Sequence, residues 1–297
     1  AAREALIEAV SVTDDELMMK YLEGEALTDA EIESALAVGT KSGEVVPVFC
    51  GSATTNVGIA ELLNYCVQCL PSPAETVDVG IDTKTNEEVE IKPSDSTLNA
   101  LVFKTLADPY VGKLNLFKVL SGTLKSDSVV YNVSRGREER IGQLFVMKGK
   151  ENIPVNQLGA GDIGAVAKLQ ETNTNDVLSV KGSTIVAKGI DFPKPVMTMA
   201  VQPLSKGDED KIGNGLARLA EADPAFKVEK SAETSEILIS GLGDLHLEVM
   251  CSRLHKKFGA EVKLSTPSVP YRETIRGKVK VEGKHKKQTG GRGQYGH

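Results

Sequence analysis

Residues 1–44 carry apolar side chains at helical spacing, with polar side chains between them. Thr13 and Thr28 each stand three residues before a glutamate. That is the spacing of a capping box, so we expect each threonine to begin a helix. Residues 45–50 are a short apolar run that predicts a buried strand, and residues 58–70 return to the helical pattern before a proline ends it.

Residues 97–186 have a different pattern, in which short alternating runs are separated by glycine, proline and aspartate turns. The predicted strands cover residues 99–105, 113–120, 128–133, 139–147 and 162–169. No long helical pattern lies between them, which favours a closed antiparallel β-barrel. The polar residues before this segment predict a linker with a short hairpin.

Residues 195–265 predict the order strand, helix, strand, strand, helix, strand. The strands are expected at 196–203, 226–229, 237–240 and 260–264, and the helices at 208–222 and 244–258. This order is the ferredoxin-like split arrangement, with both helices on one face of an antiparallel sheet and the other face open to a partner. From residue 269 onward, alternating apolar positions predict one more strand, which leads into a basic, glycine-rich segment.

The composition indicates which class of protein the chain belongs to, and it leaves the predicted helices and strands as they are. The chain has 297 residues, of which 40% are apolar and 26% charged, as in ordinary globular domains. No apolar run reaches the roughly 18–20 residues of a membrane helix, so no membrane contact is expected. Four cysteines and the lack of a signal peptide predict a reducing, cytoplasmic location. Both ends look cut, so we expect a fragment of a longer protein.

Charge is distributed unevenly along the chain. Residues 1–76 hold thirteen acidic and three basic side chains, whereas residues 272–297 hold eight basic and two acidic ones. The basic end predicts an RNA contact, in which cationic side chains bind phosphates, amide and hydroxyl groups reach bases or ribose, and glycines permit close approach. The predicted contact residues are Lys284, His285, Lys286, Lys287, Gln288, Thr289, Gly290, Gly291, Arg292 and Gly293. A flexible, solvated hairpin is the alternative.

The sequence gives little support for other kinds of binding or catalytic site. The sequence contains no G-x-x-x-x-G-K-[ST] motif, and the G-x-G-x-x-G match at residues 291–296 follows a basic tract and opens no predicted helix. Cys66 and Cys69 lie within a predicted helix without a second ligand pair, so both are expected in a core, as are the other two cysteines. His246 and His255 lack a nucleophile partner, and structural or interface roles are expected for them.

Several motifs together resemble one family closely. The segment KHKKQTGGRGQYGH at 284–297 resembles the opening of domain IV of bacterial elongation factor G, and ISGLGDLHLE at 239–248 resembles that family's domain III signature. Further similarities to its domain II lie at residues 108–114, 119–122, 139–142 and 160–163, and to the end of its GTPase domain at 14–25 and 47–53. The basic triplet at 285–287 is similar to divergent elongation factor G-like paralogues.

The resemblance implies a multidomain α+β chain. It comprises the C-terminal part of a P-loop GTPase domain at 1–76, a linker at 77–96, the domain II β-barrel at 97–192, the ferredoxin-like domain III at 193–268 and the start of domain IV at 269–297. The implied function is that of a ribosome-dependent GTPase that promotes movement of tRNA and mRNA. The implied partners are ribosomal RNA, and tRNA and mRNA at the decoding centre, with the chain itself monomeric.

The resemblance also assigns a nucleotide segment. Gly51, Ser52 and Ala53 match the fifth guanine-nucleotide motif, whose backbone N–H groups face the guanine O6. The P-loop, the switch regions and the Asn-Lys-x-Asp motif are absent from this sequence. GTP and Mg²⁺ are therefore expected for the intact parent and not for this chain, which is expected to be catalytically inactive. The alternatives are a ribosomal-protection-type relative and a non-enzymatic module that binds ribosomes or RNA.

Overall fold

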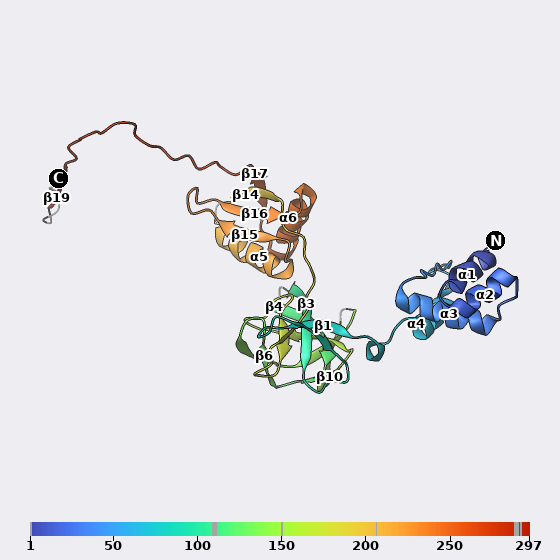
Figure 1. Ribbon diagram of the computed structural model, residues 1–297. Coiled ribbons are helices and arrows are strands. Elements are labelled where there is room, and N and C mark those ends of the chain that lie inside the picture. The colour runs from blue at the N-terminus through green and yellow to red at the C-terminus, as the bar shows by residue number, and fades with distance from the viewer. Residues whose placement is uncertain (1, 109–111, 150, 206, 288–290, 292) are drawn as a thin grey trace. The chain divides into compact units, whose positions relative to one another are not determined.

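The computed structural model of the chain describes residues 2–108, 112–149, 151–205, 207–287, 291 and 293–297 (Figure 1). The chain divides into two compact units, residues 1–191 and 192–297. Helices and antiparallel sheets both occur, which confirms the predicted α+β class. Within the described ranges, no helix is long and apolar enough to cross a membrane.

The N-terminal segment contains four helices. They are α1 (Ala2–Ser11), α2 (Asp15–Glu23), α3 (Asp29–Ser42) and α4 (Ile59–Cys69). Side chains of α1, α2 and α3 share a small apolar cluster, and α4 contacts α3 through the Thr40 and Tyr65 hydroxyls. Thr28 forms the predicted capping box with Glu31 at the start of α3. The prediction for Thr13 is wrong, because Asp14 caps α2 through its carboxylate. The Thr13 hydroxyl instead donates to the Val10 carbonyl oxygen at 2.8 Å, at the end of α1.

Glu31 makes the stability of this helical segment depend on pH. The hydrogen bond from the Lys20 ammonium, and then the Thr28 backbone N–H, lower the pKa of the Glu31 carboxyl to about 2. Because the folded-state pKa lies below the usual value of 4.5, this contribution is complete above about pH 4.5 and is lost as pH falls toward about 2. We expect Glu31→Gln to remove that part of the acid-induced loss, measured by hydrogen exchange of α2 and α3. Glu33→Gln on the same helix should leave it; equal acid profiles for the two variants would contradict the assignment.

The predicted buried strand over residues 45–50 is wrong. Val46 is 80% exposed and Val48 88% exposed, and Cys50, expected in a core, is exposed as well. A strand needs a neighbour that pairs with its N–H and C=O groups. In the described part of the chain, no strand pairs with residues 45–50, so the run forms no strand and most of it is exposed.

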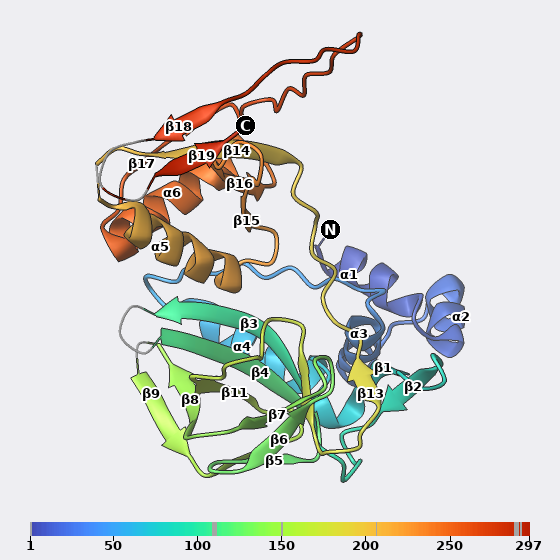
Figure 2. The same cartoon turned by 90° about the vertical axis from the view of Figure 1, so that its left-hand side faces the viewer.

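The barrel segment is formed by short antiparallel strands. They are β1 (Asp78–Asp82), β2 (Glu88–Ile91), β3 (Asn99–Asp108), β4 (Gly112–Ser121), β5 (Thr123–Lys125), β6 (Val129–Asn132), β7 (Arg137–Arg140), β8 (Leu144–Lys148), β9 (Glu151–Val155), β10 (Gln157–Gly159), β11 (Ile163–Ala167), β12 (Val177–Ser179) and β13 (Ile185–Ala187). The main sheet has the order β7-β6-β12-β3-β4-β11-β8-β9 and curls around one apolar core (Figure 2). The short hairpin predicted in the linker is formed by β1 and β2, and β1 also pairs with β13. The single strand expected at 139–147 is divided into β7 and β8.

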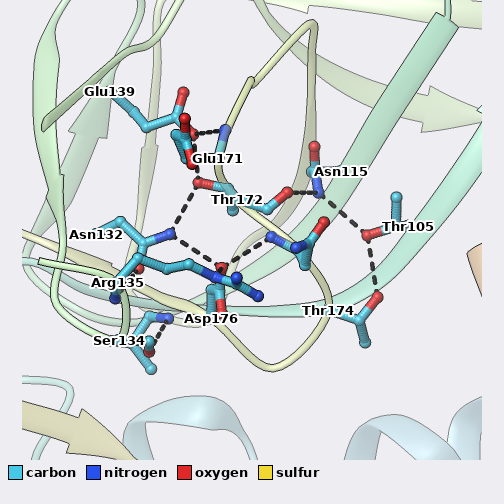
Figure 3. Close-up of polar contacts among 12 residues, drawn as sticks. Thr105, Asn115, Asn132, Ser134, Arg135, Glu139, Glu171, Thr172, Thr174 and Asp176 are labelled. Atoms are coloured by element: carbon cyan, nitrogen blue, oxygen red, sulfur yellow. Dashed lines mark hydrogen bonds and ion pairs between the residues drawn. The ribbon is translucent and has the colours of Figure 1, made fainter. Parts of the chain in front are cut away.

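A buried carboxylate, Glu139 on β7, ties the loop between β11 and β12 to the barrel (Figure 3). Glu139 is only 6% exposed. Its two oxygens accept hydrogen bonds from the backbone N–H groups of Gln170 at 3.1 Å and Glu171 at 2.7 Å, and from the Thr172 hydroxyl at 2.9 Å. Three donors satisfy the buried charge, which offsets its desolvation.

A second buried carboxylate, Asp176, closes the same loop (Figure 3). Its Oδ2 atom accepts from the Asn132 side-chain amide at 3.0 Å, the Arg135 guanidinium at 2.8 Å and the Asn173 backbone N–H at 2.8 Å. The Asn132 amide also donates to the Thr172 hydroxyl at 3.0 Å, which joins the two carboxylate groups into one network. This polar layer is a structural part of the barrel.

The second unit contains the predicted ferredoxin-like fold. Its elements are β14 (Met197–Pro203), α5 (Glu209–Ala222), β15 (Lys227–Lys230), β16 (Ile237–Gly241), α6 (Asp244–Phe258) and β17 (Val262–Ser265). The sheet order β15-β16-β14-β17 is that of a split βαββαβ unit. Side chains of α5 and α6 share one core with the sheet, and Figure 1 shows both helices beside it.

The strand predicted from residue 269 onward is absent up to residue 284. Residues 266–284 form no strand within the described residues, and Tyr271 is 89% exposed. Alternation alone therefore did not produce a strand here, because no neighbouring strand supplies the ladder. Pairing begins only at the basic, glycine-rich end of the chain.

Candidate nucleic-acid interface

A two-stranded hairpin carries the predicted basic site. β18 (His285–Lys287) pairs with β19 (Gln294–Gly296), and Lys286 lies directly opposite Tyr295. Of the predicted contact residues, Gln288, Thr289, Gly290 and Arg292 lie outside the described residues. The hairpin therefore brings together Lys284, Lys286 and Lys287 at the base of the glycine-rich connection, and all three are exposed.

One face of the hairpin combines cations with rings. Residues two apart in a strand share a face, so Lys284 and Lys286 lie on the same side as Tyr295. The Lys284 Nζ atom is 6.0 Å from the centroid of the Tyr295 ring, at the outer limit of a cation–π contact. The His297 ring lies stacked beside Tyr295, with centroids 6.4 Å apart and an interplanar angle of 29°. We call Lys284, Lys286, Tyr295 and His297 the ring face.

An acidic side chain holds the histidine of the ring face. His297 Nε2 lies 2.7 Å from Glu282 Oε1, a hydrogen-bond distance. This contact positions the imidazole next to Tyr295. Tyr295, His297 and Glu282 were not among the residues predicted for this site, because their contacts depend on the pairing of β18 with β19.

The segment predicted to face guanine is a tight loop between residue 50 and α4. The Ser52 N–H donates to the Val57 carbonyl oxygen at 2.9 Å, which closes the loop. Within the described chain, the N–H groups of Gly51 and Ala53 have no protein acceptor. Gly51 and Gly58 are required by close backbone contact, because a Cβ atom on either would lie 2.8 Å or less from a backbone oxygen. The loop can therefore present backbone donors to a ligand.

Gly58 is expected to tolerate alanine poorly. Its φ is +76°, and an added Cβ would lie 2.7 Å from the Cys50 carbonyl oxygen. Gly58→Ala should therefore cost more than the ~1–2 kcal/mol of a left-handed non-glycine residue alone. Gly43→Ala is the matched control, because its φ is +82° and no atom lies near the added Cβ. Hydrogen exchange of α4 and α3 amides measures the two costs, and equal costs would rule out the clash.

The remaining candidate residues have structural contacts. Cys69 is buried in α4 as predicted, whereas Cys66 is half-buried. His246 Nδ1 accepts the Leu242 N–H at 3.0 Å, and His246 Nε2 lies 3.1 Å from Asp223 Oδ2, which ties the start of α6 to the end of α5. Among the residues that the structure describes, no three His, Cys, Asp or Glu side chains gather as a metal site would require.

Family models of known proteins match the barrel, the ferredoxin-like unit and the C-terminal hairpin. Family models match in order: "Elongation factor G domain 2" over residues 97–181, "Elongation Factor G, domain III" over residues 192–266, and "Elongation factor G, domain IV" over residues 267–297. A crystal structure of a protein from Thermus thermophilus is 34% identical, with a TM-score of 0.71. That match covers 99% of this chain and 42% of the other, so this chain spans less than half of the similar protein.

Proposed function

The chain belongs to the elongation factor G family, and we propose from this that it acts as part of a cytoplasmic, ribosome-dependent GTPase that promotes tRNA and mRNA movement. Three consecutive domain matches support the family and hence a role in translation elongation. The observation that carries the proposal furthest is the basic hairpin at the end of the segment matched to domain IV, because its exposed lysines suit ribosomal RNA, or tRNA and mRNA at the decoding centre.

We propose a division of roles within the intact protein. GTP and Mg²⁺ bind to motifs that this sequence does not contain, so this chain alone does not hydrolyse GTP. Gly51, Ser52 and Ala53 add one side of the guanine pocket. The closed loop supports this role, because the Ala53 N–H has no acceptor among the described residues. The barrel and the ferredoxin-like unit connect the nucleotide-binding part of the protein to the hairpin.

RNA binding by the hairpin is tested by its salt dependence. Each lysine that neutralises a phosphate adds about 0.7 to the slope of log K against log salt for single strands. The triple variant Lys284→Ala, Lys286→Ala, Lys287→Ala should therefore bind an unstructured RNA oligomer more weakly, with the slope reduced by about 2. Fluorescence anisotropy over a salt series measures both quantities.

The matched control neutralises three exposed lysines elsewhere, Lys227, Lys230 and Lys263, on strands β15 and β17. It changes the net charge by the same amount and should leave the slope nearly unchanged. If the hairpin variant and this control weaken RNA binding equally, only net charge matters and the proposed hairpin contact is wrong.

A further inference from the structure

We propose that a pocket between the barrel and the β13-β1-β2 sheet binds a guanidinium group, either of a small molecule or of an arginine side chain. The pocket has a volume of about 260 Å³, which suits one small group better than a whole cofactor. Its walls include Glu90, Ile91, Asp95, Asn99, Ser121 and Ile185. The pocket contains no residue of the basic hairpin or of the loop at residues 51–53, so this inference goes beyond the proposed function.

Asn99 on β3 requires a further hydrogen-bond donor, because one of its two polar side-chain atoms has no partner. The residue is only 4% exposed. Its amide nitrogen donates to the Ile185 carbonyl oxygen at 3.3 Å, which links β3 to β13. Among the described residues, no donor reaches the remaining atom, Oδ1, which is buried. A buried acceptor left unsatisfied costs free energy, so we expect a group that donates to it from the pocket.

The other polar groups in the pocket wall are also acceptors, and two of them are negatively charged. Asp95 is held in a tight turn, where its Oδ2 atom accepts the Lys92 N–H at 2.8 Å and, within the described chain, its Oδ1 atom has no partner. The Glu90 carboxylate pairs with the Lys92 ammonium at 3.1 Å. The Ser121 hydroxyl already donates to the Thr97 carbonyl oxygen at 2.7 Å, so it can only accept.

These acceptors determine the chemical class of the ligand. Both carboxylates would repel an anion, and a water molecule that donates to Asn99 would gain nothing from their charge. A guanidinium has five N–H donors in one plane and is more weakly hydrated than an ammonium. It therefore suits a pocket in which acceptors stand beside the side chains of Ile91 and Ile185.

The test uses the full chain and two probes of nearly equal shape, methylguanidinium and its uncharged analogue methylurea. NMR follows binding through the side-chain amide resonance of Asn99. Methylguanidinium should shift this resonance in a saturable way, and methylurea should bind about tenfold more weakly, because it lacks the charge that the carboxylates attract.

Surface variants determine the sign of the charge effect. Glu90→Gln should weaken methylguanidinium binding about threefold, and Lys92→Met, which removes the competing ammonium, should strengthen it by a similar factor. Glu88→Gln lies on the same strand but outside the pocket, so it is the matched control and should have no effect. Asn99→Ala should abolish binding, but it also loses the bond to Ile185, so the surface variants decide the test.

A pentapeptide with one central arginine between glycines distinguishes the two sources of the guanidinium. If it binds as tightly as methylguanidinium, an arginine side chain of another protein can fill the pocket; if only the free compound binds, the ligand is a small guanidino compound. Equal binding of methylguanidinium and methylurea, an unchanged Asn99 resonance, or tighter binding by Glu90→Gln would overturn the proposal. None of these results depends on whether the hairpin binds RNA.

Discussion

Glu139→Ala should destabilise the barrel by about 3 kcal/mol or more, because it leaves three buried donors without their acceptor. Those donors are the N–H groups of Gln170 and Glu171 and the Thr172 hydroxyl (Figure 3). Each unsatisfied buried donor costs about 1–3 kcal/mol, although water that enters the truncated site lowers the total. The loss should appear as faster native-state hydrogen exchange in β6, β7 and β12.

The adjacent residue provides the control. Glu138 lies on the same strand but is exposed, and its carboxylate pairs with the Lys181 ammonium at 2.7 Å. Glu138→Ala should change barrel stability by less than about 1 kcal/mol, as is usual for a surface ion pair. If both variants exchange at the same rates, the buried network contributes little, and the loop between β11 and β12 must be held by other contacts.

Leu254→Ala should destabilise the ferredoxin-like unit by about 2–5 kcal/mol, the range for a buried leucine whose cavity does not collapse. Leu254 is fully buried, and α5 approaches it so closely that a Cβ atom on Gly215 would lie 2.5 Å from Leu254 Cδ1. The two helices therefore pack without a spacer at this point, and truncation leaves a void between two rigid elements. Hydrogen exchange of α5 and α6 amides measures the effect.

Leu245→Ala is the matched control for this truncation, since Leu245 lies on the same helix and is 70% exposed. It should change stability by less than about 0.5 kcal/mol. A similar loss in both variants would mean that helix propensity, and not packing between α5 and α6, determines the stability of the unit. Stabilisation by Leu254→Ala would contradict the packing itself.

Helices and strands whose packing or pairing partners were also predicted could be placed from the sequence. In residues 197–265, each predicted strand pairs with another predicted strand, and both helices cover the same sheet, so all six elements are confirmed within two residues. The capping box at Thr28 also depends only on residues three apart. Local chemistry is sufficient for the capping box, and in the ferredoxin-like unit the partner of every strand is itself a predicted strand.

Strands could not be predicted where the sequence does not identify the neighbouring strand that would pair with them. Residues 45–50 and the run after residue 269 have strand-like patterns, but pattern alone does not supply a neighbouring strand. The roles of Glu139 and Asp176 were missed because most of their donors lie more than thirty residues away in the sequence. At the hairpin, the lysines were evident from charge, whereas the place of Tyr295 among them depended on strand register.

Directed cleavage of ribosomal RNA tests most directly whether the hairpin contacts RNA of the ribosome. An iron chelate is attached at Lys286→Cys, in a chain whose Cys50 and Cys66 are replaced by serine, and hydroxyl radicals are generated on purified ribosomes. Lys125→Cys on β5 of the barrel is the control tether. We predict that cleavage from position 286 maps to decoding-centre RNA and that cleavage from position 125 maps elsewhere. Identical cleavage from both positions, or none from 286 while the chain is bound, would show that the hairpin does not contact this RNA.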